Sequence, residues 1–315
     1  MTLTIGVDVG GTKVAGGVVD PDGEVVARTR RETPANDPPK IRDLIVEVVA
    51  ELARQHTVEA VGIGAAAWID AARATVLFAP NLAWRDEPLR EYVAAAVDLP
   101  VVVENDANAA AWAEFRHGAA RDADDSMVMF TVGTGIGGGI VFGGDLVRGA
   151  HGIAGELGHV QVVPDGRPCG CGRHGCLEQY ASGQALARYA QGLARREPSK
   201  VSALLNSAGS DPDAITGVMV TAAAAAGDPV AREAFVDIGG WLGRGLADLA
   251  QILDPQVLVV GGGVIEAGDL LLGPARAMYV AELARRGRFP VAEIRPAELG
   301  NDAGMVGAAD LARRR

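Results

Sequence analysis

The feature that most constrains the fold is a pattern of strands and turns that occurs twice in the chain. The first copy has an apolar strand over Leu3–Val9, a turn rich in Gly and Thr, a second strand over Val14–Val19 and a Gly/Asp turn. The second copy begins with the apolar run Met127–Val132 and continues through Gly133–Gly139 to a Gly/Asp turn at 143–145. Two copies of one unit indicate a weak internal repeat. We therefore predict two related α/β domains, each presenting a glycine-rich turn to a shared cleft.

The spacing of apolar residues predicts the remaining elements. Steps of three and four residues are typical of helices, and short apolar runs bounded by turn residues are typical of strands. The predicted helices cover 41–52, 89–97, 106–115, 230–253, 270–286 and 302–312, and the whole of 181–253 is expected to be mostly helical. Further strands are predicted over 24–31, 58–65, 101–103 and 257–260. At roughly 100–200 residues per domain, the chain length also agrees with two domains. We place a small domain at 1–118 and a large one at 119–301, with 302–315 packing back on the first.

Charge and patterning exclude several classes of protein. The net charge is −11, from 29 basic and 40 acidic residues. An acidic surface repels nucleic-acid phosphates and anionic lipid, so we expect neither as a partner. Charged residues or Gly interrupt each apolar stretch before it could span a bilayer, and Met1–Gly6 lacks the pattern of a secretory signal. We expect a cytoplasmic protein.

The glycine-rich turns are candidate phosphate sites. Gly lets the backbone approach a phosphate closely and adopt positive φ, and a Thr hydroxyl can add a donor. For either turn alone the alternative is a tight hairpin, but two turns in matching contexts favour phosphate binding. Neither turn ends in the Gly-Lys-Ser/Thr of a P-loop, and Asp8 could hold Mg²⁺ through water. The predicted nucleotide-binding residues are Asp8, Gly10, Gly11, Thr12, Lys13, Thr134, Gly135, Gly262 and Gly263.

A polar cluster follows the short apolar run Val101–Val103. Its residues Glu104-Asn105-Asp106-Ala107-Asn108 lead into an Ala-rich helix, and the carboxyl ends of strands face the ligand crevice in α/β sheets. Asp106 can accept the proton of a hydroxyl that attacks a phosphorus atom, and Asn105 can hydrogen-bond neighbouring hydroxyls. The alternative is that Asp106 only caps the following helix, because Asp is a favoured N-cap residue. The residues alone leave both interpretations open.

All the cysteines of the chain, Cys169, Cys171 and Cys176, lie within eight residues. In a reducing compartment such a cluster indicates a metal site before a disulfide. Together with His159 they offer one imidazole and three thiolates, which fits a closed structural zinc site with no open position for chemistry. His174, inside the loop, is an alternative fourth ligand whose tight spacing would strain the chelate. The remaining alternative is three free thiols in a glycine-rich loop.

Two carboxylates flank this loop. Glu156 lies three residues before His159, and Glu178 lies two residues after Cys176. Fixing the metal ligands would fix both carboxylates, and carboxylates form strong hydrogen bonds with the hydroxyls of a sugar. The alternative is a pair of solvated surface residues, the usual environment of Glu. Their position beside the loop favours sugar binding.

Together these motifs resemble the ROK family (repressors, open reading frames and kinases) within the actin-like sugar kinase fold. The resemblance rests on Asp8–Thr12, Glu104–Asn108, Gly155–His159 and Cys169–Glu178, which stand in the family's order and extend over nearly the whole chain. It implies an α/β protein of the actin-like ATPase (ribonuclease H-like) fold, with two α/β domains around a cleft. It also implies Asp106 as catalytic base, with ATP, Mg²⁺ and structural Zn²⁺ as cofactors.

The resemblance further implies a set of sugar-binding residues. They are Asn81, Asn105, Asp106, Glu156, His159 and Glu178, and Asn81 rests on the resemblance alone. His159 would use one ring nitrogen for the metal and the other for a sugar hydroxyl. The segment Gly64–Asp70, whose backbone is implied to approach the sugar, departs from the family's usual Gly-x-Pro-Gly-x-Val-Asp. Ala66 and Ala67 stand where Pro and Gly are common.

The activity implied by the resemblance is transfer of the γ-phosphoryl group of ATP to the 6-hydroxyl of glucose. N-Acetylmannosamine kinase or another hexose kinase is the alternative within this class. A sugar-responsive repressor would need a DNA-binding segment, usually ahead of the first phosphate turn, where seven residues precede Asp8. A third hypothesis is a zinc-stabilised sugar-binding module without catalysis. The presence of Asp106 and of both glycine-rich turns disfavours it. Expected partners are glucose, MgATP and further copies of the chain in a dimer or tetramer.

Overall fold

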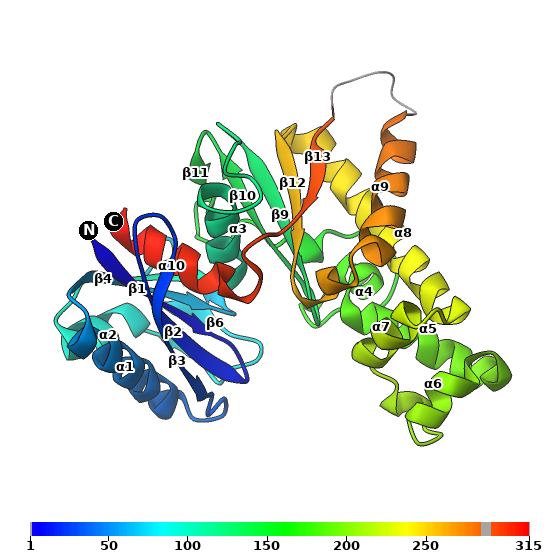
Figure 1. Ribbon diagram of the computed structural model, residues 1–315, viewed down its shortest axis with the longest axis horizontal. Coiled ribbons are helices and arrows are strands. Elements are labelled where there is room, and N and C mark those ends of the chain that lie inside the picture. Colours follow the sequence, from blue (N-terminus) through cyan, green and yellow to red (C-terminus); the bar gives the residue numbers. More distant parts are fainter. Residues whose placement is uncertain (1, 285–290, 315) are drawn as a thin grey trace. The chain divides into compact units, whose positions relative to one another are not determined.

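The computed structural model describes residues 2–284 and 291–314 (Figure 1). Contacts within the chain divide it into two units. The first contains Met1–Val128, Gly138–Gly155 and Glu298–Arg315, and the second contains Met129–Gly137 and Glu156–Ala297. Each unit is described by itself below. The domain limits expected from the sequence stay a prediction.

A mixed five-stranded sheet forms the centre of the first unit. Its order is β3-β2-β1-β4-β8, with β1 antiparallel to β2 and parallel to β4, and with β4 parallel to β8. The strands are β1 (Leu3–Val9), β2 (Lys13–Val19), β3 (Val25–Glu32), β4 (Val58–Ala65) and β8 (Val101–Asn105). Because β1, β4 and β8 are parallel neighbours, their carboxyl ends share one edge of the sheet. Asp8 and Asn105 both lie at that edge.

Helices cover both faces of this sheet, and the sequence decides which helix packs on which face (Figure 1). The helix α1 (Pro38–Gln55) buries an apolar stripe of Ile41, Ile45, Val48, Val49 and Leu52 against it. Burying each such side chain contributes about 1.5–3 kcal/mol.

The C-terminal helix α10 (Ala303–Arg313) approaches the opposite face at backbone distance. A Cβ atom on Gly6 would lie 1.9 Å from the Met305 carbonyl oxygen, and one on Gly62 would lie 1.8 Å from that of Ala308. These two glycines are therefore required by packing.

The second sheet repeats the strand order of the first. Its order is β11-β10-β9-β12-β13. In both sheets, three strands that are consecutive in the chain lie side by side in reverse order, and two strands from later in the chain pair next to the first of them. The strands are β9 (Met127–Val132), β10 (Ile136–Phe142), β11 (Asp145–Leu146), β12 (Val257–Gly261) and β13 (Glu293–Pro296). This shared order agrees with the internal repeat read from the sequence.

The other helices and strands are short connections or helical layers. In the first unit they are α2 (Leu89–Val97), α3 (Asp106–Arg116) and a small sheet of β5 (Trp68–Ile69), β6 (Val76–Phe78) and β7 (Arg85–Glu87). In the second they are α4 (Glu178–Ala181), α5 (Gly183–Arg196), α6 (Ser202–Ser207), α7 (Gly217–Ala225), α8 (Pro229–Leu253) and α9 (Asp269–Ala284).

Most elements expected from periodicity are present, with ends shifted by a few residues. The sequence missed the small sheet β5-β6-β7 and the strand β13, because two- to four-residue strands carry too few residues to show alternation. The helix expected over 270–286 is α9, and positions 285–286 lie outside the described residues.

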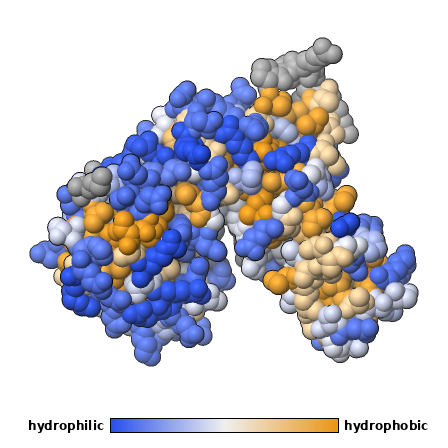
Figure 2. Space-filling view, viewed as in Figure 1, coloured by the Kyte–Doolittle hydropathy of each residue, from blue (hydrophilic) through white to orange (hydrophobic). Residues whose placement is uncertain are grey.

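On the face drawn in Figure 2, hydrophilic and apolar residues are interspersed. Among the described residues, no helix combines the length and apolar character needed to cross a membrane.

Candidate active site

The first glycine-rich turn joins β1 to β2. It is closed by a hydrogen bond from Gly10 N to the Lys13 carbonyl oxygen at 2.9 Å, and the Thr33 hydroxyl donates to the Gly10 carbonyl oxygen at 2.8 Å. A Cβ atom on Gly11 would lie 3.3 Å from Cβ of Asn81, so the structure brings Asn81 beside the turn. The expectation of positive φ is wrong here, because the described glycines with positive φ lie elsewhere. These glycines instead permit other atoms to approach the backbone of the turn closely.

Asp8 is the penultimate residue of β1 and lies next to this turn and to the start of α10. A Cβ atom on Gly304 would lie 3.2 Å from Asp8 Oδ1, so the helix begins against the carboxylate. Burial and the negative charge of Asp106 raise the pKa of Asp8 to about 6, while Lys13 acts in the opposite direction. The negative charge of Asp106 thus disfavours the ionisation of Asp8, and a bound divalent cation would offset that repulsion.

Asp106 begins α3 but does not cap it. The N-cap is Asn105, whose Oδ1 accepts a hydrogen bond from Asn108 N at 2.9 Å and whose Nδ2 donates to the Ala67 carbonyl oxygen at 3.1 Å. The reading of Asp106 as a mere cap is therefore wrong. Burial raises the pKa of Asp106, against backbone hydrogen bonds that lower it, among them Ala107 N to Oδ1 at 2.9 Å. A raised pKa suits a carboxylate that must accept a proton near neutral pH.

The three cysteines and His159 converge in the second unit. The four candidate ligand atoms lie within 4.8 Å of one another, with His159 Nδ1 3.5 Å from Cys169 Sγ and the sulfurs of Cys171 and Cys176 3.7 Å apart. Burial and the neighbouring sulfurs raise the pKa of Cys176 to about 12. Such thiols ionise readily only beside a cation, which is what a metal ion would supply. The group contains His159 and not His174, which favours His159 as the fourth ligand.

Glu178 connects this cluster to the second glycine-rich turn. Its Oε2 accepts a hydrogen bond from Ile136 N at 3.0 Å, and its Oε1 lies 3.8 Å from Cys169 Sγ. A Cβ atom on Gly135 would lie 2.2 Å from Glu178 Oε2, so the turn needs glycine where the carboxylate approaches. Half-buried and hydrogen-bonded, Glu178 is not the solvated surface residue of the alternative reading.

Glu156 lies on the other side of the histidine ring. Its Oε2 is 3.8 Å from Nε2 of His159, while Nδ1 of the same ring faces the sulfur of Cys169. The ring thus presents one nitrogen to the candidate metal ligands and the other to a carboxylate. The use of the second nitrogen for a sugar hydroxyl stays a prediction.

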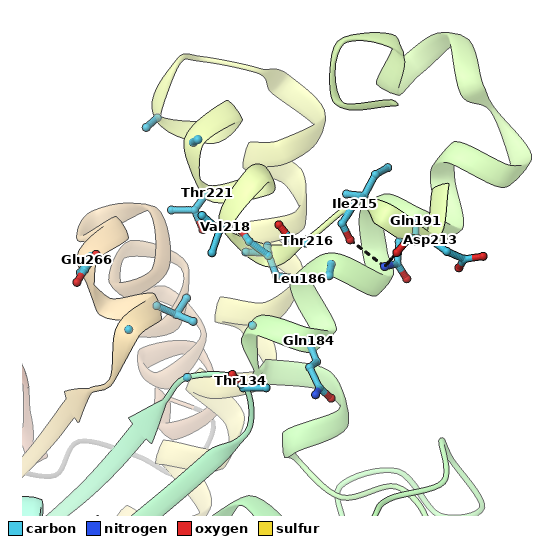
Figure 3. Close-up of a pocket in the computed structure, with 18 residues that line it drawn as sticks. Thr134, Gln184, Leu186, Gln191, Asp213, Ile215, Thr216, Val218, Thr221 and Glu266 are labelled. Atoms are coloured by element: carbon cyan, nitrogen blue, oxygen red, sulfur yellow. Dashed lines mark hydrogen bonds between the residues drawn. The ribbon is translucent and has the colours of Figure 1, made fainter. Parts of the chain in front are cut away.

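The second turn opens into a cavity of about 810 Å³ (Figure 3). Gly133 and Thr134 of the turn line it, together with Gly263 after β12 and side chains from α5 and α7. Further lining residues include Gln184, Leu186, Gln191, Ile215, Thr216, Val218, Thr221 and Glu266. Gln191 Nε2 donates to the Ile215 carbonyl oxygen at 2.8 Å, which fixes one wall.

The two predicted glycines after β12 differ in position. Gly263 lines the cavity, whereas Gly262 has φ of 85° and packs on the backbone of Val132, where a Cβ atom would lie 2.5 Å from the carbonyl oxygen. Gly262 therefore lets the chain turn after β12 against Val132, and Gly263 borders the cavity.

Comparison with known proteins identifies the family. The ROK family model matches residues 4–315. The chain belongs to the ROK family. It is 50% identical over 313 residues to a glucokinase of Streptomyces coelicolor, covering 99% of this chain and 98% of that protein. It is 33% identical over 312 residues to an N-acetylmannosamine kinase of Yersinia pestis, covering 98% of each.

A solved structure has the same fold as this ROK protein. A ROK family glucokinase from Streptomyces griseus, in complex with glucose and AMPPNP, matches with a TM-score of 0.89 and 51% identity, over 99% of this chain and all of that one. The ROK sugar kinases have the actin-like ATPase fold, so the expected fold class is confirmed.

The sequence reading missed the cavity walls on α5 and α7 of this ROK protein. A signal was present at Ser182-Gly183 and Thr216-Gly217, each a capping residue followed by a glycine. Ser182 Oγ accepts from Ala185 N and Thr216 Oγ1 accepts from Met219 N, both at 3.3 Å. Gly183 lets the start of α5 approach the turn, because a Cβ atom there would lie 2.8 Å from the Gly133 carbonyl oxygen, and Gly217 lets the start of α7 approach Gly183, whose carbonyl oxygen would lie 2.6 Å from a Cβ atom on Gly217.

Proposed function

We propose that this chain is an ATP-dependent glucokinase, which transfers the γ-phosphoryl group to the 6-hydroxyl of glucose. The observation that carries the proposal is the 50–51% identity over nearly the full length to ROK glucokinases, one of them solved with glucose and AMPPNP. The carboxylates and glycine-rich turns described above supply the chemistry that such a reaction needs.

Asp106 is the proposed general base. Phosphoryl transfer depends on positioning and charge neutralisation more than on strong base chemistry, and a carboxylate at a helix start can receive the hydroxyl proton as the oxygen attacks phosphorus. The Asn105 cap fixes the first turn of α3 and leaves the Asp106 carboxylate free of that task. Burial keeps the pKa of Asp106 raised, which increases its readiness to take a proton.

Asp8 is the proposed position for Mg²⁺, held through water. The raised pKa of Asp8, about 6, and its interaction with Asp106 fit a site completed by a divalent cation. When bound, Mg²⁺ would neutralise charge on the phosphate oxygens. Gly10, Gly11, Thr12 and Lys13 lie in the adjoining turn and are proposed to contact phosphate.

The cavity of the second unit is the proposed nucleoside site. Its floor includes Gly133 and Thr134, and its walls are formed by two helices and by Gly263, which gives a concave, largely apolar space suited to a flat base and a ribose. We infer that Thr134 and Gly135 meet phosphate and that Gly262 and Gly263 lie towards the adenosine.

The Cys₃His cluster is the proposed zinc site. Three sulfurs and one imidazole nitrogen form the donor set of closed structural zinc sites, so Zn²⁺ would hold the loop and do no chemistry. Through Cys169 and the ring of His159 the cluster also sets the positions of Glu178 and Glu156. These two carboxylates, His159, Asn81, Asn105 and Asp106 are the proposed sugar contacts.

A coupled assay with MgATP and a panel of hexoses tests the proposal. Glucose should be the preferred substrate over mannose and N-acetylmannosamine at a fixed ATP concentration. Preference for N-acetylmannosamine would favour the activity of the Yersinia relative instead. Absence of turnover on every hexose would reject a kinase. Dimer or tetramer assembly and a cytoplasmic location stay predictions.

A further inference from the structure

A buried carboxylate between two arginines lies one residue before the Asn105 cap. Glu104 is 1% exposed, and its Oε2 lies 2.7 Å from Arg148 Nε and 3.2 Å from Arg73 Nε. The Arg148 side chain is 10% exposed. Fully buried Glu is rare unless it is paired, so this triad is a built feature of the unit.

Arg148 does more than neutralise Glu104. Its Nη2 donates to the Asp70 carbonyl oxygen at 2.9 Å, and its Nη1 donates to the Ala71 carbonyl oxygen at 3.0 Å. A planar guanidinium can satisfy partners in several directions at once, which a lysine ammonium on a flexible stem does not reproduce. One side chain therefore joins the end of β8 to the segment that contains β5.

That segment, residues 66–73, is tied to the end of β8 at further points. Asn105 Nδ2 donates to the Ala67 carbonyl oxygen at 3.1 Å, and Val103 N donates to the Arg73 carbonyl oxygen at 3.1 Å. Arg73 itself has φ of 55°, a left-handed conformation that a non-glycine residue holds only when its surroundings enforce it.

Gly152, in the loop after Arg148, presses on the same segment. It has φ of 85°, and a Cβ atom there would lie 2.4 Å from the Ile69 carbonyl oxygen. Segment 66–73 is thus held by Arg148 and Gly152 on one side and by Val103, Glu104 and Asn105 of β8, directly before Asp106, on the other.

Stability alone is a weak reason for such a triad. Removing buried charges from water is costly, and replacing a buried ion pair with apolar side chains of similar volume is often neutral or stabilising. What the triad supplies is a fixed geometry between two backbone segments. The pKa of Asp106 is set by burial and backbone hydrogen bonds, so the triad acts on the base through position.

We propose that Arg148 is a positioning residue for sugar selectivity, which holds segment 66–73 in register with Asn105 and Asp106. The inference rests on the proposed hexose kinase activity. A loosened segment would let the sugar shift relative to Asp106, and a displacement of about 1 Å in such a site lowers the rate by roughly 10²-fold. Selectivity falls too, since wrong sugars are rejected only by a fixed arrangement of hydrogen-bond partners.

The test is Arg148→Lys, which keeps the positive charge and removes the planar guanidinium that bonds in several directions. We expect kcat/KM for glucose to fall by about tenfold to hundredfold, and the glucose-to-mannose ratio of kcat/KM to change by about threefold or more. Mannose differs from glucose at C2, so the ratio reports sugar orientation. The KM for ATP and the acid limb of the kcat profile against pH should match the wild type.

Arg313→Lys is the matched control. Arg313 Nη2 donates to Thr4 Oγ1 at 3.0 Å and to the carbonyl oxygens of Val19 and Asp20, and Nη1 pairs with Asp310. Thr4 lies at the amino end of β1, whereas Asp8 lies at the carboxyl end. This variant should lose stability while keeping kcat/KM and the sugar ratio.

The outcomes separate the inference from the proposed function. A wild type without turnover on any hexose ends the kinase proposal, whatever the variants do. An active wild type with an unchanged sugar ratio in Arg148→Lys overturns the positioning role, as does an equal change of ratio in Arg313→Lys. If circular dichroism shows that Arg148→Lys does not fold, Glu104→Gln is tested in its place. That variant keeps the shape of Glu104 but weakens both pairings, and it must change the ratio in the same direction.

Discussion

Replacing Asp8 by Asn should stabilise the folded protein and remove its activity at the same time. The folded-state pKa of Asp8 is raised from 3.8 to about 6 by burial and by the charge of Asp106. The native state therefore binds a proton more tightly than the unfolded chain does. Stability from this group is fully present at low pH and is lost as pH rises from 3.8 through about 6. Asn carries no charge, so the variant escapes that loss.

The magnitude follows from the displacement of the pKa. The wild type loses roughly 3 kcal/mol once Asp8 is fully ionised, since each pKa unit corresponds to about 1.4 kcal/mol. The advantage of Asp8→Asn should therefore grow from about 1 kcal/mol near pH 4.5 to about 3 kcal/mol at pH 8. For a unit of this size, that is a rise in Tm of about 6–12 °C at pH 8.

The assay is thermal unfolding followed by circular dichroism, without added Mg²⁺, at pH values from 4.5 to 8. Asp145→Asn, an exposed position on β11, changes the net charge equally and serves as control. Added Mg²⁺ should stabilise the wild type more than Asp8→Asn and narrow the gap. A gap that is constant across pH, or one in favour of the wild type at pH 8, would refute the electrostatic reasoning.

Three further changes test the site and the fold. Asp106→Ala should lower kcat by about 10²–10⁴-fold while glucose binding measured by calorimetry persists; unchanged turnover would remove Asp106 from the mechanism. Cys171→Ser should lose zinc by elemental analysis and weaken glucose binding, and an unaltered affinity after complete zinc loss would separate the cluster from the sugar site. Gly62→Ala should destabilise the protein by about 1–3 kcal/mol or more, because its Cβ atom would lie 1.8 Å from the Ala308 carbonyl oxygen; a wild-type Tm would contradict this packing.

Local pattern was enough to predict the longer strands, the turns and the candidate metal cluster. The cysteines are close in sequence, so their convergence with His159 needed little tertiary information. The same holds for the turn at Gly10 and Gly11, which is closed by neighbouring residues. The repeat in the sequence likewise anticipated two sheets of equal strand order, because each sheet starts from the same three-strand unit.

Contacts between distant residues were beyond such reasoning. Gly6 and Gly62 read as weak points in strands, and the need for glycine there becomes visible only when α10, at the far end of the chain, lies against the sheet. The cavity beside Gly133 and Thr134 was missed for a related reason. Its walls come from α5 and α7, whose helical periodicity reports burial but not which open space a helix borders.

The choice between Asn105 and Asp106 as helix cap shows where sequence reasoning stops. Both residues are good caps, and their propensities do not decide between adjacent positions. The structure decides through backbone geometry: Asn105 has φ of −64° and ψ of 142°, the extended conformation of a cap, and its side chain reaches Asn108 N. That one-residue offset makes Asn105 the cap and leaves the Asp106 carboxylate near Asp8, where its negative charge disfavours the ionisation of Asp8. The proposed base and the proposed cation position therefore share one edge of the sheet, where a bound divalent cation would relieve the repulsion between the two carboxylates.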